Sequence, residues 1–176
     1  MTYRATERVH TVEARRIELE AEVPFAQLRR AFEQQVPELD QRLQRGLLDQ
    51  GADWSTLTRM LEGPAMHGLV RFWTGDPRPV MRVGGVDTAS VSYLVGDYAT
   101  AARMYRHDAG AFLYSPFRVE LHDVRGGRTV LSVEQPSAPL RGFGNNKITQ
   151  AGYEYDRKLG DLLEDLGLPR PSVLRL

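Results

Sequence analysis

The chain has 176 residues, of which 41% are hydrophobic and 26% charged, as in an ordinary globular domain. Its 23 lysine and arginine residues balance its 23 aspartate and glutamate residues, so we expect neither nucleic acid nor a membrane as a partner. Cysteine is absent, which excludes disulfides, thiolate catalysis and cysteine-ligated metal sites. The first residues lack the apolar core of a signal peptide, so we expect a cytoplasmic protein.

The amino-terminal part of the sequence predicts a strand followed by a helix. In residues 8–22, apolar residues such as Ile17 and Leu19 alternate with charged residues, which is typical of a half-buried strand. Pro24 suits the first position of a helix. From residue 25 to residue 36 apolar side chains repeat every three to four positions, which predicts an amphipathic helix.

Two more helical regions precede the middle of the chain. Residues 38–63 are polar with scattered leucines, and we predict two short helices there. The second of them should begin at Asp53 or Ser55 as its cap and end at Gly63. Asp97 is well placed to cap a helix over residues 98–107, because its carboxylate can accept free backbone N–H groups.

The strand predictions depend on alternating side chains and on turn residues. The turn Gly75-Asp76-Pro77 separates two segments that we expect to pair, and Arg125-Gly126-Gly127 predicts a hairpin. In chain order, the predicted strands after the first are 67–74, 79–84, 90–95, 117–124 and 128–134.

A long helix closes the predicted structure. Asn145 or Asn146 should cap it, and Gly167 should end it after Leu166. Residues 168–176 are expected to be a loosely ordered tail. The apolar side chains on one face of this helix are Ile148, Ala151, Tyr155, Leu159, Leu162 and Leu166.

This order of elements predicts an α+β fold with two layers, in which helices cover a mostly antiparallel sheet. A twisted sheet with a long helix across its concave face often encloses a cavity between the two. Such a cavity is the default site for a small ligand. We therefore expect a ligand-binding cavity between the sheet and the carboxyl-terminal helix.

A series of short motifs then carries a family resemblance. They are Gly96-Asp97-Tyr98, Met104, His107-Asp108-Ala109, Leu113-Tyr114-Ser115-Pro116-Phe117-Arg118, Gly126-Gly127, Gln135-Pro136-Ser137 and Phe143-Gly144-Asn145. In this order and spacing, over Tyr93–Leu163 and with the amino-terminal strand and helix, the chain resembles the domain-of-unknown-function family 302.

The resemblance implies a TATA-binding-protein-like, helix-grip-like architecture formed by a single domain over residues 1–167. It also implies that residues 38–90 form a longer insertion than the shorter family members have. The chain departs from the family at Gly96-Asp97-Tyr98, where Asn-Pro is commoner. Because the family has no agreed activity, the resemblance supplies no mechanism.

His107 is the candidate catalytic residue. It follows the predicted helix 98–107 at its carboxyl end, where the helix dipole favours a proton, and Asp108 lies next to it. It could act as a general acid or base, as a donor to a ligand, or, with haem bound, as the axial ligand. The alternative is a charged helix cap. No spacing of ligand residues predicts another metal site.

The remaining candidate ligand contacts are Tyr105, Tyr114, Arg118 and Gln135. Arg118 and Tyr114 flank a Ser-Pro turn at a strand start, where arginine could bind a carboxylate or phosphate through its planar guanidinium. The alternative for Arg118 is an ion pair with Glu120, Glu134 or Asp108. Gln135 follows the hairpin, and Tyr105 could form a wall of the cavity.

Three hypotheses about function follow. The first is a module that binds an apolar or amphipathic small molecule in the cavity, with His107, Tyr114 and Arg118 as polar contacts. The second is an enzyme that uses the cavity, through His107 as acid or base or through haem. The third is a structural or interaction domain without a ligand. A homodimer is an open alternative, because homodimers are the commonest assembly.

Overall fold

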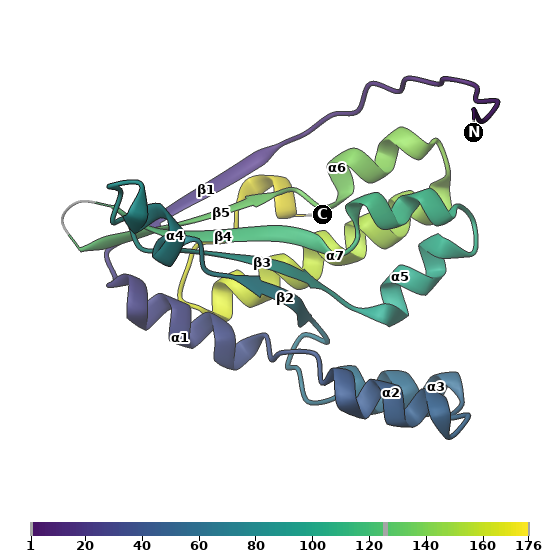
Figure 1. Ribbon diagram of the computed structural model, residues 1–176, viewed down its shortest axis with the longest axis horizontal. Coiled ribbons are helices and arrows are strands. Elements are labelled where there is room, and N and C mark those ends of the chain that lie inside the picture. The colour runs from purple at the N-terminus through teal and green to yellow at the C-terminus, as the bar shows by residue number, and fades with distance from the viewer. Residues whose placement is uncertain (1, 125–126, 176) are drawn as a thin grey trace.

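The computed structural model of the protein describes residues 2–124 and 127–175 (Figure 1). Within them, no helix combines the length and the apolar character needed to cross a membrane. The strands are β1 (Arg16–Ala21), β2 (Val70–Gly75), β3 (Ser90–Gly96), β4 (Phe117–Val124) and β5 (Arg128–Glu134). The α-helices are α1 (Phe25–Gln35), α2 (Gln41–Asp49), α3 (Trp54–Glu62), α4 (Arg78–Val83), α5 (Tyr98–Tyr105), α6 (Ser137–Leu140) and α7 (Asn146–Asp165). Three short 3-10 helices are η1 (Ala109–Tyr114), η2 (Arg141–Phe143) and η3 (Ser172–Leu174).

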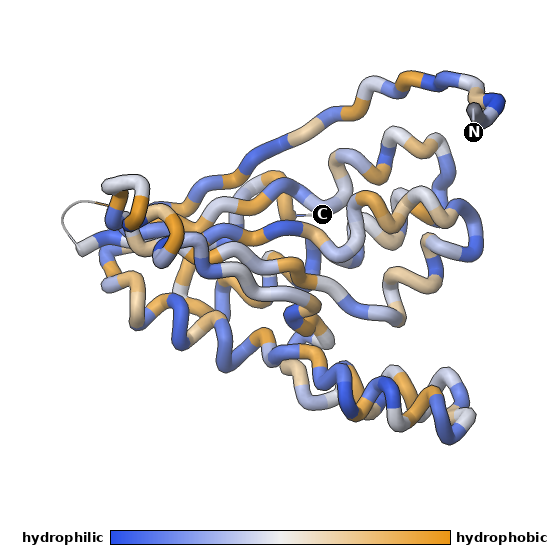
Figure 2. Tube along the Cα trace, in the orientation of Figure 1, coloured by the Kyte–Doolittle hydropathy of each residue, from blue (hydrophilic) through white to orange (hydrophobic). Residues whose placement is uncertain are grey.

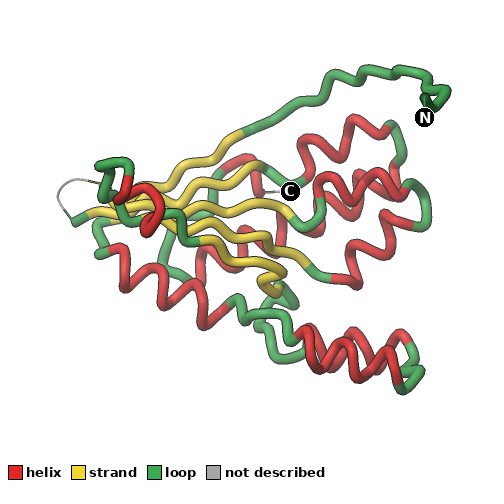
Figure 3. Tube along the Cα trace, viewed as in Figure 1, coloured by secondary structure: helices red, strands yellow, loops and turns green. Residues whose placement is uncertain are grey.

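The five strands form one sheet in the order β1-β5-β4-β3-β2, and every neighbouring pair is antiparallel (Figure 3). The predicted hairpin is confirmed, since β4 and β5 pair from Val119 opposite Val133 to Val124 opposite Arg128. Residues 125 and 126 of its predicted turn lie outside the described residues. The α+β class and the antiparallel sheet agree with the sequence prediction.

Helices α1 and α7 cover one face of the sheet, which we call the inner face. Phe32 of α1 stacks on Tyr93 of β3 with ring centroids 4.8 Å apart. Tyr155 of α7 packs edge-on against Phe117 of β4 at 5.5 Å. All four side chains belong to one buried hydrophobic cluster, so the sheet and the two helices form the predicted two layers.

Strict alternation along the strands separates the two faces of the sheet. In β4, Phe117, Val119 and Leu121 are buried in the core, whereas Arg118 is exposed and Glu120 half-buried. Hydrophobic and hydrophilic positions alternate in the same way along the neighbouring strands (Figure 2). The other face, the outer face, is therefore polar and faces solvent, as is usual in antiparallel sheets.

Helices α2 and α3 form a pair beside the sheet, next to α5 (Figure 1). As predicted, residues 38–63 form two short helices, and the Asp53 carboxylate accepts the Thr56 N–H at 2.8 Å. A second, smaller core holds the pair in place. Its buried members are Leu39, Leu57, Leu61, Ala65 and Val70.

Two predicted strands are wrong in whole or in part. Residues 79–84 do not pair with β2 but belong to helix α4, because Pro79 lacks an N–H for a strand ladder and suits the first turn of a helix. The first strand begins at Arg16, and residues 8–15 form an irregular arm. The ladder ends there because β5 gives way to α6 at Ser137, whose N–H, the next that could reach β1, is accepted by the Asp156 carboxylate.

The carboxyl-terminal helix has the predicted cap, since the Asn145 side chain accepts the N–H groups of Lys147 and Ile148. The segment after it was expected to be loosely ordered, but it packs against the core. Leu174 is 1% exposed, and the Val173 carbonyl accepts a hydrogen bond from Gln135 at 3.0 Å. Burial of Leu174 and the Gln135 hydrogen bond offset part of the entropy cost of ordering this segment.

Candidate functional site

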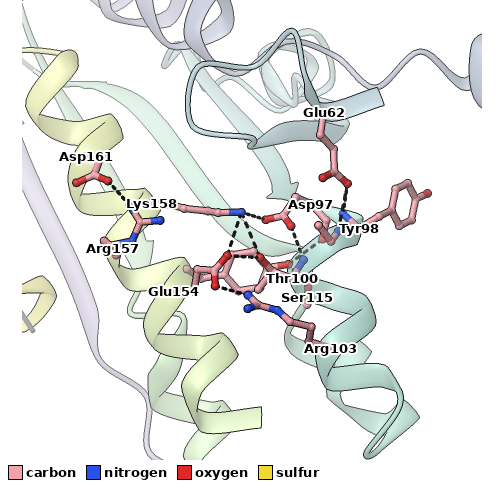
Figure 4. A network of polar contacts seen from close by, with 12 residues as sticks. Glu62, Asp97, Tyr98, Thr100, Arg103, Ser115, Glu154, Arg157, Lys158 and Asp161 are labelled. Carbon is pink, nitrogen blue, oxygen red and sulfur yellow. Dashed lines mark hydrogen bonds and ion pairs between the residues drawn. The ribbon is translucent and has the colours of Figure 1, made fainter. Parts of the chain in front are cut away.

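A network of charged groups lies between the start of α5 and the middle of α7 (Figure 4). Asp97 caps α5, accepting the Thr100 N–H at 2.5 Å, and its second oxygen accepts from the Lys158 ammonium at 2.7 Å. Glu154 accepts the Thr100 hydroxyl and pairs with Arg103. Although burial opposes it, the Arg103 guanidinium holds the pKa of Glu154 below its usual range. Every charged group in this network thus has an opposite partner.

Glu62 connects α3 to the same region. Its carboxylate accepts the backbone N–H groups of Tyr98 and Ala99, at 2.6 and 3.3 Å, at the start of α5. Burial, and secondarily the negative charge of Asp97, raise the pKa of Glu62 above its usual range. The carboxylate therefore acts as a second cap of α5 that is expensive to ionise.

Tyr155 lies beneath this network and is completely buried. Its hydroxyl lies 2.9 Å from the Ser115 hydroxyl and donates to the Asp97 carbonyl at 3.1 Å. Burial, followed by the nearby Asp97 charge, raises the pKa of this phenol well above its usual range. Tyr155 is a neutral hydrogen-bonding group, and its partners make it part of the architecture.

A second buried carboxylate organises the end of β5. Asp156 of α7 is fully buried and accepts the Ser137 N–H at 2.9 Å, the Ser137 hydroxyl at 2.6 Å and the Gln135 amide at 2.7 Å. Side chains thus occupy the space between the sheet and α7 where the sequence led us to expect a cavity. The pocket that contains Tyr114, Arg118 and Gln135 lies elsewhere.

That pocket has a volume of about 430 Å³ and opens on the outer face of the sheet. We call it the outer-face pocket. Its apolar wall consists of Leu94, Leu113, Tyr114, Pro116, Pro136 and Pro139. Its charged and polar groups are Arg16, Arg118, Glu120, Ser132, Glu134 and Gln135. The sheet supplies the polar floor, and the segments that enter β4 and leave β5 supply the apolar wall.

The charged groups of the outer-face pocket differ in their partners. Glu120 accepts the Ser92 hydroxyl, and Arg16 lies 3.3 Å from Glu18. No ion pair or hydrogen bond within the described residues engages the Arg118 guanidinium, so none of the predicted pairs with Glu120, Glu134 or Asp108 forms. Gln135 is 3% exposed, and in the same part of the chain its Oε1 atom has no hydrogen-bond partner. Arg118, which has no partner among the described residues, therefore lies beside an apolar wall, whereas the Gln135 amide is buried and bonded to Asp156 of α7.

The structure brings together three of the five predicted site residues. Tyr114, Arg118 and Gln135 line the outer-face pocket. Tyr105 and His107 do not reach it, because they lie on exposed sides of α5 and its end. His107 lines a pocket of about 290 Å³ with Arg103, Arg106, Lys147, Gln150 and Ala151.

The surroundings of His107 do not fit haem. A haem ring needs an apolar pocket on both faces, whereas the groups around this imidazole are cationic or polar except for Ala151. Among the residues that the structure describes, no three histidine, aspartate or glutamate side chains cluster as metal ligands would. His107 is therefore better placed to contact an anion than to ligate iron.

Sequence reasoning missed the part that β1 and β5 contribute to the pocket. Arg16 on β1 lies opposite Glu134 on β5, and Leu94 on β3 lies opposite Arg118 on β4. The sequence did indicate which face Arg118 occupies, because Arg118 alternates with the core residues Phe117 and Val119 along the strand. What could not be inferred is that β3 would lie on the other side of β4 and that β1 would lie beside β5.

The fold and the pocket together define a two-layer α+β protein with an open pocket on the uncovered face of its sheet. The fold matches the crystal structure of an uncharacterized conserved DUF302 protein from Bacillus stearothermophilus. The TM-score is 0.58 at 12% identity, and the match covers 86% of this chain and 97% of that chain. No family model and no curated protein matches the sequence. The resemblance to family 302 is thus supported by a fold match over 86% of the chain.

Proposed function

We propose that the protein binds an amphipathic small molecule that carries a carboxylate, and that it does so in the outer-face pocket. The observation that carries this is the unpaired Arg118 guanidinium beside an apolar wall. Arginine recognises carboxylates by two parallel N–H donors, and such charge-assisted hydrogen bonds are the strong ones. The ligand's apolar part would contact Leu94, Tyr114 and the prolines.

The other polar groups of the pocket leave Arg118 for the ligand. Arg16 lies opposite Glu134 and near Glu18, and Glu120 accepts from Ser92, so Arg118 is the charged group of the pocket that is left for a ligand. The Gln135 side chain is buried and fixed by Asp156 and Val173 on the inner side, so it supports the edge of the pocket and does not reach the ligand. The proposed ligand site therefore lies on the outer face of the sheet, and not between the sheet and α7 where the sequence led us to expect it. We further propose a cytoplasmic location, which the cysteine-free sequence supports and cell fractionation tests.

A matched pair of probes tests the carboxylate. Decanoate and decanol have the same apolar chain, and titration calorimetry of the purified protein should show tighter binding of decanoate. Arg118→Ala should weaken decanoate binding roughly 10- to 100-fold, the loss of about 1.5–3 kcal/mol for a hydrogen bond to a charged group. Its decanol binding should stay unchanged.

Arg30→Ala is the control, since Arg30 is an exposed arginine on α1 with no side-chain partner among the described residues. Its affinity for decanoate should equal that of the unmodified protein. Equal binding of decanoate and decanol would contradict recognition of the carboxylate at the proposed site. A large fall in melting temperature for Arg118→Ala would assign Arg118 to the structure and would contradict the proposed site as well.

A further inference from the structure

Helix α5 separates two pockets that lie outside the site described above. One has a volume of about 450 Å³ and lies between α3, α5 and η1. The other has a volume of about 290 Å³ and lies between the end of α5 and the start of α7. Arg106 lines both pockets. We call them the aromatic pocket and the basic pocket.

The aromatic pocket is formed by rings from three separate elements. Its rings belong to Trp54, Tyr98, Tyr105 and Phe112. Trp54 is 52% exposed, Tyr105 56% and Phe112 42%, so their faces are available to a ligand. Several exposed rings around one hollow exceed the scattered apolar side chains that a surface normally carries.

Three of the four rings are held in place by contacts within the protein. Tyr105 and Phe112 pack edge to face at 5.1 Å. The Tyr98 hydroxyl accepts a hydrogen bond from Gln44 at 2.7 Å, and its ring packs edge-on against Phe72 at 5.1 Å. Fixed rings lower the entropy cost of binding a flat ligand.

The basic pocket gathers positive charge that the protein itself does not neutralise. Arg103 is paired with Glu154. In the described part of the chain, the side chains of Arg106, His107 and Lys147 have no ion pair and no hydrogen bond. Lys147 stands in the first turn of α7, a helix of 20 residues whose amino terminus adds positive potential. Converging unpaired cations suit an anion with several oxygens, such as a phosphate.

We propose that the two pockets form one site for a mononucleotide. The base would stack on the rings of the aromatic pocket, and the phosphate would bind in the basic pocket. Because Arg106 lines both pockets, its side chain stands where the sugar joins the two halves of such a ligand. Aromatic stacking accepts any base, so the site recognises ring and phosphate rather than base identity.

The site goes beyond the amphipathic carboxylate of the outer-face pocket in both chemistry and place. A long aliphatic chain does not use the faces of four rings, and a single carboxylate leaves most of the cationic groups unmatched. The two sites share no lining residue. Arg118→Ala should therefore leave nucleotide binding unchanged, so that failure of one site is distinguishable from failure of the other.

Tryptophan fluorescence can report on the site directly. The chain has two tryptophans, Trp54 and the exposed Trp73, so Trp73→Phe leaves Trp54 as the sole reporter. Titration with the 5′-monophosphates of adenosine, guanosine, cytidine and uridine should quench Trp54. Adenosine should bind at least tenfold more weakly than its monophosphate, and inorganic phosphate should cause no quenching. Absence of quenching by all four nucleotides would overturn the proposal.

Charge-removing variants then separate the two halves. Arg106→Gln combined with Lys147→Gln should weaken adenosine monophosphate at least tenfold and leave adenosine unchanged. Trp54→Ala, followed by calorimetry, should weaken both. Arg30→Gln is the control and should change neither. All of these side chains are exposed, so the melting temperature should stay within a few degrees. Equal nucleotide affinity in the double variant and the unmodified protein would overturn the phosphate site.

Discussion

The two faces of the sheet use charged side chains in opposite ways. On the inner side, Asp97, Lys158 and Asp156 are buried or nearly so, and each has hydrogen bonds or an ion pair with geometry close to ideal. On the outer face, Arg118 is exposed and unpaired within the described residues. The inner charged groups are therefore held by protein partners, whereas Arg118 lies beside an apolar wall without such a partner among the described residues.

The difference shows that a perturbed or buried ionisable group need not mark a functional site. Burial raises the pKa of Tyr155, yet that phenol is closed in by Ser115 and the Asp97 carbonyl and has no access to a ligand. Structural networks shift pKa values as active sites do. In this protein the proposed site rests on an unpaired arginine beside an apolar wall, and not on a shifted pKa.

The largest effect is expected from Lys158→Met. It removes the ammonium that neutralises Asp97, whose side chain has no exposure, and an uncompensated buried carboxylate should cost about 3–5 kcal/mol. The melting temperature should fall by roughly 10 °C or more, measured by differential scanning calorimetry. Arg118→Ala, on the other face, should change it by a degree or two.

A double variant tests whether the unpaired charge of Asp97 causes the loss of stability in Lys158→Met. Asparagine caps helices as well as aspartate does, so adding Asp97→Asn to Lys158→Met should recover part of the lost stability. If Lys158→Met and Arg118→Ala lowered the melting temperature equally, the two faces would not differ as described.

Replacing two glycines by alanine tests how tightly the inner side is packed. The expected changes in stability are smaller than for Lys158→Met and opposite in sign for the two glycines. A Cβ atom on Gly152 of α7 would lie 2.9 Å from the Ser137 Cα, which is backbone that cannot move freely. Gly152→Ala should therefore destabilise the protein by about 1–3 kcal/mol. On the open helix α2, a Cβ atom on Gly46 would meet nothing closer than the Gln50 amide at 4.0 Å.

Gly46→Ala is thus the matched control, and it should stabilise the protein by up to about 1 kcal/mol through helix propensity alone. Urea unfolding of both variants measures the change in the free energy of unfolding, which should have opposite signs for the two variants. A neutral Gly152→Ala would mean that α6 and α7 can move apart and that the inner side has room after all.

Much of the fold could be predicted because its signals are local. The caps at Asp53, Asp97 and Asn145 each depend on a side chain and the next few N–H groups, and all three are observed. Residues 79–84 were misjudged because six residues with some alternation fit a short strand as well as a short helix. The proline at position 79 was the better signal.

The site was harder to predict because it depends on which segments become neighbours. Tyr114, Arg118 and Gln135 were predicted because they flank strand ends, and all three line one pocket. We expected them on the inner face, but the pocket opens on the outer face. The alternation of Arg118 with Val119 along the strand indicates the outer face for Arg118. The contact of Glu62 with the start of α5 has no local signal, since no pattern in α3 indicates which helix it will meet.

The smallest effect is expected from Glu62→Gln, and its pH dependence is more informative than its size. Because burial, and then Asp97, raise the pKa of Glu62 in the folded protein, the folded state binds a proton at this carboxyl more tightly than the unfolded chain does. Its charge therefore opposes folding above the raised pKa, and that cost disappears as the pH falls toward the usual carboxyl range. Glutamine carries no charge and can still accept from the Tyr98 N–H.

Glu62→Gln should thus melt higher than the unmodified protein at pH 8, and the difference should vanish near pH 4. Glu22→Gln, on an exposed glutamate, should show no such trend. A variant that melts lower at every pH would mean that the negative charge of Glu62 stabilises α5 by more than its burial costs. The inner side would then depend on an uncompensated charge, and the absence of a partner at Arg118 would no longer distinguish the two faces.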